Sequence, residues 1–232
     1  MKSRQEIKAN AKEAMYAQRP EAILIPLLLT VFGIIIGTLS AIPSIIQPDP
    51  DPFSLVSLVS LAVSLLSSLF MAALGVNVFG AFILIYSKRK AEVGKPVSDM
   101  KVRFWRKAGG MYYMGLWVTV WSMLLVIPGI VKGIAYSMTP FILADCPNVT
   151  ATQALKVSQK MTRGHKLELF VMYLSWIGWC LLVPLTLGIL GVVYVMPYMY
   201  STFAGYYSEL KDIAIKNGIL SPAELGEGML SG

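Results

Sequence analysis

The sequence predicts an all-α polytopic membrane protein, a bundle of about six transmembrane helices with short amphipathic helices on the cytoplasmic side. Only 14% of the 232 residues are charged, whereas a soluble domain has roughly 25%. Several long runs lack Asp, Glu, Lys, Arg and His, and most exceed the ~18 apolar residues that signal a membrane span. This composition excludes a water-soluble enzyme, a disordered chain and a disulfide scaffold. The runs are 22–48, 53–87, 108–131, 133–144 and 169–208.

Residues 1–19 are expected to form an amphipathic cytoplasmic helix. The pattern Ser3-x-x-Glu6 is a capping box, in which each side chain accepts a hydrogen bond from a helix N–H that would otherwise lack a partner. Apolar residues from Ile7 to Met15 share one face, and basic residues occupy another. This layout is typical of a helix lying at a lipid interface, and a short solvated helix is the alternative.

Residues 20–210 are expected to form one transmembrane domain of six spans. The first span covers about residues 22–42, and the acidic, proline-rich loop with Asp49 and Asp51 that follows is expected outside the cell. The run 53–87 is longer than one bilayer crossing. We therefore expect this helix to tilt, protrude or break.

The next segment, residues 88–107, is basic, with aromatic residues interleaved. Beside a membrane span, such a segment is expected to contact anionic lipid, at up to ~1 kcal/mol per cation, although the same pattern can bind nucleic acid. We favour lipid contact, or a plain topology signal, over nucleic acid. The candidate lipid-binding residues are Lys88, Arg89, Lys90, Lys101, Arg103, Trp105, Arg106 and Lys107.

A proline interrupts the apolar residues 108–144 at Pro128-Gly129. Because proline lacks an N–H donor and clashes with the preceding turn, the helix should kink or end there. The segment forms either a hairpin of two short spans or one long broken helix. We favour the hairpin, because it returns the basic segment 156–166 to the side of the other cations.

Further signals organise the C-terminal half. Thr150-x-x-Gln153 is a second capping box and predicts a short amphipathic helix. The run 169–208 is long enough for two spans joined by a turn near residues 186–188, and residues 211–232 are expected to form a polar cytoplasmic tail.

The distribution of positive charge predicts the orientation. In the six-span layout, 19 of the 20 Lys and Arg residues lie on one face, and only Lys132 lies elsewhere. The positive-inside rule places this face, with both termini, in the cytoplasm.

The sequence contains no recognisable catalytic motif. It has one histidine and no P-loop, GxGxxG, GxSxG or HExxH motif, and its two cysteines form no CxxC pair. We therefore expect no enzyme activity, no metal and no cofactor.

A few polar side chains fall within the spans or at their edges. An ionisable group costs roughly 2.5–3.5 kcal/mol at mid-span, which makes such residues candidates for a substrate or proton pathway. A structural role, as an interhelical hydrogen bond or an interface marker, is the alternative for each. The candidates are Asn77, Lys132, Asp145 and Glu168.

Several sequence motifs make the chain resemble a known family. They are SMTPFILAD at residues 137–145, LSWIGW at residues 174–179, and Pro197-Tyr198. The chain resembles a family of bacterial integral-membrane proteins classed as a domain of unknown function. It is also similar in hydropathy layout to the membrane domain that accompanies some glycerophosphodiester phosphodiesterases. The resemblance implies about six spans in a bacterial cytoplasmic membrane and supplies no catalytic residues.

Two functions stay open at this point. The leading hypothesis is a non-catalytic membrane module that contacts anionic lipid or a protein partner through its basic cytoplasmic face. The alternative is a small permease or exporter with its pathway at the Pro128-Gly129 break, since discontinuous helices often build transport sites. A homo-oligomer is compatible with both.

Overall fold

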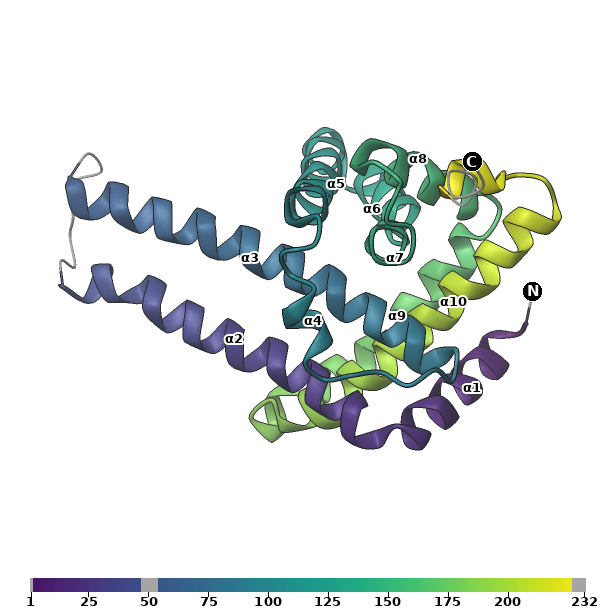
Figure 1. Cartoon of the computed structure of the whole chain (residues 1–232), viewed down its shortest axis with the longest axis horizontal. Coiled ribbons are helices and arrows are strands. Elements are labelled where there is room, and N and C mark those ends of the chain that lie inside the picture. The colour runs from purple at the N-terminus through teal and green to yellow at the C-terminus, as the bar shows by residue number, and fades with distance from the viewer. Residues whose placement is uncertain (1, 47–53, 227–232) are drawn as a thin grey trace.

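The computed structural model describes residues 2–46 and 54–226, and every regular element in these ranges is helical (Figure 1). The expected all-α class is therefore confirmed. The acidic loop with Asp49 and Asp51 lies outside the described residues. The elements are α1 (Arg4–Ala17), α2 (Arg19–Ile46), α3 (Leu55–Tyr86), α4 (Lys95–Ser98), α5 (Phe104–Leu124), α6 (Val126–Tyr136), α7 (Thr139–Asp145), α8 (Ala151–Met161), α9 (Lys166–Leu182), η1 (Pro184–Thr186), η2 (Gly191–Val195), α10 (Met196–Lys216) and η3 (Pro222–Leu225).

Four helical segments of the described chain are long and apolar enough to cross a membrane. They are Arg19–Ile42 in α2, all of α3, the joined segment Val126–Asp145 of α6 and α7, and Lys166–Thr186 of α9 and η1. By length and composition, these segments fit a membrane-protein class. Helices α5 and α10 are not among these four.

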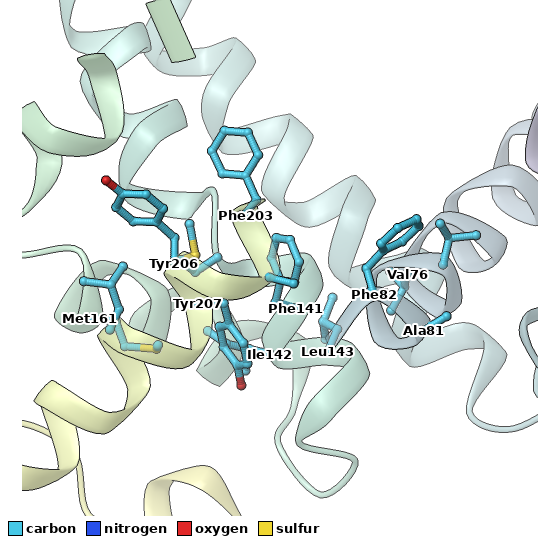
Figure 2. Close-up of a cluster of buried hydrophobic side chains, with 14 of the residues drawn as sticks. Val76, Ala81, Phe82, Phe141, Ile142, Leu143, Met161, Phe203, Tyr206 and Tyr207 are labelled. Atoms are coloured by element: carbon cyan, nitrogen blue, oxygen red, sulfur yellow. The ribbon is translucent and has the colours of Figure 1, made fainter. Parts of the chain in front are cut away.

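The buried core lies at the inner ends of the long helices, where α3 and α10 meet α7 and α8 (Figure 2). Helix α3 is continuous from Leu55 to Tyr86. Its outer part, from Leu55 to Leu66, carries exposed leucines, whereas its inner part is buried from Ala73 to Ile85. The expected break is therefore absent from this helix, whereas tilt and protrusion relative to a membrane stay predictions. The labelled core residues are Val76, Ala81, Phe82, Phe141, Ile142, Leu143, Met161, Phe203, Tyr206 and Tyr207.

Exposed apolar side chains concentrate on the parts of three hairpins that leave this core. The α2–α3 hairpin extends away from the other helices in Figure 1, and Ile34 on α2 is 61% exposed. At the α5–α6 turn, the residues from Met123 to Ile127 are 66–84% exposed, and at the α9–α10 turn Leu187 is 93% exposed. Apolar surface of this extent marks contact with something other than water.

The α5–α6 connection is a hairpin of two packed helices rather than one broken helix. The break lies at Leu125, whose backbone is extended (φ −159°, ψ 140°), three residues earlier than expected. Pro128 sits instead in the first turn of α6. A proline is tolerated there, because its missing N–H would have no intrahelical partner.

The N-terminal helix α1 has the expected capping box, with the Ser3 N–H donating to Glu6 Oε2 at 2.7 Å. Its apolar face, however, does not lie open toward lipid. Ile7 and Ala11 are fully buried, because α10 and α3 pack over this side of the helix. The lipid-interface interpretation of this face is therefore corrected to a protein contact.

The chain after residue 210 continues the last helix and then packs on the core. Helix α10 ends at Lys216, and Gly218, two residues later, has a φ of +66°. Leu220 and Leu225 beyond it are 2% and 1% exposed and belong to the main core. The described part of the tail is therefore packed, and residues 227–232 lie outside the described residues.

Close packing at the α5–α6 hairpin generates a stability prediction. A Cβ atom at Gly129 would lie 2.7 Å from the Ser122 Cα, a backbone atom that cannot rotate away. We expect Gly129→Ala to destabilise the protein by about 1–3 kcal/mol, measured by thermal unfolding in detergent. The control is Gly133→Ala on the same helix, where the nearest atom to a new Cβ is 4.0 Å away. Equal stability of the two variants would contradict the close approach.

Candidate functional site

Arg106, a predicted lipid ligand, is turned into the protein. Its Nη1 donates to the carbonyl oxygens of Cys146 (3.2 Å) and Val149 (2.6 Å), and its Nη2 donates to the carbonyl oxygen of Leu143. Burial lowers the pKa of this guanidinium. The last carbonyl groups of a helix lack intrahelical donors. Arg106 therefore closes the C-terminal end of α7 and holds the loop that follows.

Lys107 is also turned inward, and it lines a cavity of about 220 Å³ between α3, α4, α5 and α7. The residue is 7% exposed, its Nζ donates to the Asp99 carbonyl oxygen at 3.1 Å, and burial lowers its pKa. Asn77 lines the same cavity and donates to the Pro96 carbonyl oxygen at 2.7 Å. Asp145 lines it from α7. The cavity thus brings together three of the predicted residues.

Asp145 connects α7 to α10. Its Oδ2 accepts hydrogen bonds from the Tyr207 hydroxyl at 2.7 Å and from the Lys211 Nζ at 2.8 Å. Sequence reasoning missed Lys211, because it lies 66 positions away along the chain and no local pattern links the two residues. These bonds give a carboxylate at the end of an apolar helix two polar partners from α10.

The polar side chains that line the cavity mainly join neighbouring segments through hydrogen bonds. The Asn77 amide and the Lys107 ammonium both donate to backbone carbonyls, and the Asp145 carboxylate accepts from α10. Polar groups satisfied in this way stabilise a packing arrangement, because each of them would cost free energy if it were left unpaired. The geometry therefore favours the structural alternative for Asn77 and Asp145.

The turn before α5 holds the outward-facing part of the basic segment. Lys101 and Arg103 are exposed, Val102 is 57% exposed and Trp105 is 73% exposed. Arg103 adopts a left-handed conformation (φ 53°), and its Nη2 donates to the Asn148 Oδ1 at 3.1 Å. We call residues 101–105 the basic turn.

The cations that follow α3 are partly held by the N-terminal helices. Lys88 Nζ lies 2.8 Å from Glu13 Oε1, and this hydrogen bond lowers the pKa of Glu13. Arg89 and Lys90 are exposed. The Gln18 side chain donates to the Arg89 carbonyl oxygen at 2.9 Å and accepts from the Ala91 N–H. Sequence reasoning missed this role of Gln18.

The two remaining polar candidates do not line the cavity. Lys132 lies on α6, with its Nζ 4.9 Å from the ring centroid of Trp121. Glu168 lies in the first turn of α9, with its Oε2 3.6 Å from His165 Nδ1. The four predicted polar residues are therefore divided between separate places, and they do not form one pathway.

One comparison with known proteins gives a match. The model of a protein family of unknown function (DUF975) matches residues 53–214. No curated protein and no solved structure matches the chain. The matched range begins just before α3 and ends within α10, so it contains the residues that line the cavity and those of the basic turn. The likeness to phosphodiesterase membrane domains stays a prediction.

The inward placement of Arg106 gives a prediction that separates it from its neighbours. Arg106→Met would leave three carbonyl oxygens without their donor, so we expect a loss of about 3 kcal/mol in the free energy of unfolding. Lys101→Met, at an exposed position of the same segment, should change stability by less than about 0.5 kcal/mol. Denaturant unfolding in one detergent measures both, and equal values for the two variants would refute this assignment.

Proposed function

This chain belongs to the DUF975 family of proteins of unknown function, and on that premise we propose that it is a non-catalytic integral membrane protein whose basic turn contacts anionic lipid. The observation that carries the proposal is the exposure of Trp105 and Val102 beside Lys101 and Arg103. Tryptophan is enriched at membrane–water interfaces, and cations beside it attract anionic headgroups. A basic turn that also exposes apolar surface fits a lipid surface better than a nucleic acid.

The geometry narrows the set of lipid-contacting residues. Arg106 and Lys107 are engaged with backbone carbonyls, and Lys88 is paired with Glu13. The proposed contact therefore rests on the outward-facing members of the predicted set. These are Arg89, Lys90, Lys101, Arg103 and Trp105.

We place the protein in a bacterial cytoplasmic membrane, with both termini and the core on the cytoplasmic side. In the six-span layout, all three hairpins cross the bilayer. For α5–α6, a shallower insertion is better supported, because the turn from Met123 to Ile127 is entirely apolar. We therefore propose that α2–α3 crosses fully and that α5–α6 dips into the bilayer and returns.

The permease alternative has less support. Its proposed pathway was the helix break, but Gly129 packs closely against Ser122 at this place and closes the hairpin. This close packing of α5 against α6 leaves no room for a solute at the break.

Lipid retention tests the role of the basic turn. The double variant Lys101→Gln with Arg103→Gln should weaken the binding of phosphatidylglycerol by up to about 30-fold at low salt, because each cation near the surface contributes about 1 kcal/mol. The control, Lys12→Gln with Lys216→Gln, removes the same charge at exposed positions elsewhere. The measurement is binding of fluorescent phosphatidylglycerol to the purified protein at low and high salt. If both double variants bind equally, the basic turn has no lipid role.

Cysteine labelling tests the topology, in a chain whose own two cysteines are replaced by alanine. An impermeant reagent added to intact cells should label Ser54→Cys and not Lys101→Cys. Leu125→Cys should stay unlabelled from either side, because its turn lies within the hydrocarbon. Labelling of Leu125→Cys from outside would overturn the shallow hairpin and restore the six-span layout, and labelling of Lys101→Cys from outside would reverse the orientation.

A further inference from the structure

A second basic site lies between α6, α8 and the start of α9, away from the basic turn. These elements line a groove of about 380 Å³. Five cations line the groove, and no acidic side chain is among the described residues that line it. The cations are Lys132, Lys156, Lys160, Arg163 and Lys166.

The walls of the groove are fixed by buried hydrogen bonds. The Ser158 hydroxyl donates to the Ala135 carbonyl oxygen at 2.7 Å, and the Thr162 hydroxyl donates to the same oxygen at 3.3 Å. Both hydroxyl side chains are fully buried. Helix α8 is therefore attached to α6 one turn from Lys132. This attachment brings Lys132, the one cation that the six-span layout placed away from the others, beside the basic segment 156–166.

The positive charge of the groove is only partly compensated. Lys160 pairs with Glu224 at 2.5 Å. Glu168, two residues after Lys166, lies beside His165 and not in the groove. Like charges held close together repel one another, so the arrangement favours an anion that carries more than one charge. Arg163 adds a planar fork of donors that suits phosphate oxygens.

Exposed apolar side chains flank two of the lining cations in the sequence. Ile130 and Val131, just before Lys132, are 47% and 41% exposed, and Leu167 after Lys166 is 74% exposed. The Trp121 ring lies under the Lys132 ammonium. A ligand that matches both surfaces has a multiply charged head and an apolar tail, which describes a lipid rather than a free anion.

We propose that this groove binds the phosphate monoester or diphosphate headgroup of a membrane lipid, with its acyl chains along α6 and α9. The inference rests on the proposed placement of the core at the cytoplasmic membrane surface, and it is independent of the basic turn. A diester headgroup with a single negative charge fits the groove less well than a monoester or a diphosphate.

The test compares three probes on the full-length protein in detergent. The probes are phosphatidic acid, phosphatidylglycerol and inorganic pyrophosphate. We expect phosphatidic acid to bind most tightly and to raise the melting temperature, because a ligand that binds the folded state stabilises it. Lys132→Gln should weaken phosphatidic acid binding about tenfold, the size of one charge-assisted contact. Lys132→Arg, which keeps the charge, should retain binding, and Lys216→Gln is the surface-charge control.

Each outcome decides the proposal. Loss of phosphatidic acid binding in Lys132→Gln, with binding kept in Lys132→Arg and in Lys216→Gln, supports a separate headgroup site. Equal binding of phosphatidic acid and phosphatidylglycerol overturns the monoester assignment. Pyrophosphate binding as tight as that of phosphatidic acid overturns the lipid source. If Lys132→Gln does not fold, Lys166→Gln takes its place, and unchanged binding there also overturns the site.

Discussion

The end of α7 is the joint on which the rest of the structure depends. This helix has only seven residues, and its last carbonyl groups need donors from elsewhere. From α5, Arg106 donates to the Leu143 carbonyl and to the Cys146 carbonyl that follows the helix, and Asp145 accepts from Tyr207 and Lys211 on α10. Each of these groups would cost about 1–3 kcal/mol if it were buried without a partner. The bonds therefore fix α5 and α10 to a common centre, where α3 also packs.

This joint divides the apolar residues into two populations. Side chains near α7 are buried by protein, and Phe141 stacks on Tyr207 with ring centroids 5.6 Å apart. Side chains farther out along the hairpins have no second layer of protein to cover them, and they remain exposed. Helix α3 contains both populations, because its inner part reaches the joint and its outer part does not. The surplus of apolar residues in the composition is thus the population exposed along the hairpins.

Local sequence signals predicted local structure well, and the contacts between distant segments were missed for a physical reason. Both capping boxes join residues three positions apart, and the turn at Gly188 depends on one backbone conformation, so each is visible in a short window. The pairing of Asp145 with Lys211 depends on how α7 meets α10, which no short window contains. The amphipathic pattern of α1 is the same whether lipid or protein covers its apolar face. A cluster of cations likewise does not reveal that Arg106 points inward.

Lys132 links the headgroup site to the depth of the α5–α6 hairpin. This residue lies seven positions after Leu125, which is about 10 Å along a helix, whereas the hydrocarbon layer is about 30 Å thick. A turn on the outer surface would place Lys132 inside the hydrocarbon, together with the four other cations that share its groove. Removing these charges from water would cost far more than the apolar turn could gain. If Lys132 lies at the cytoplasmic surface, all 20 Lys and Arg residues are on one side, and a bound headgroup would stabilise the hairpin at this depth.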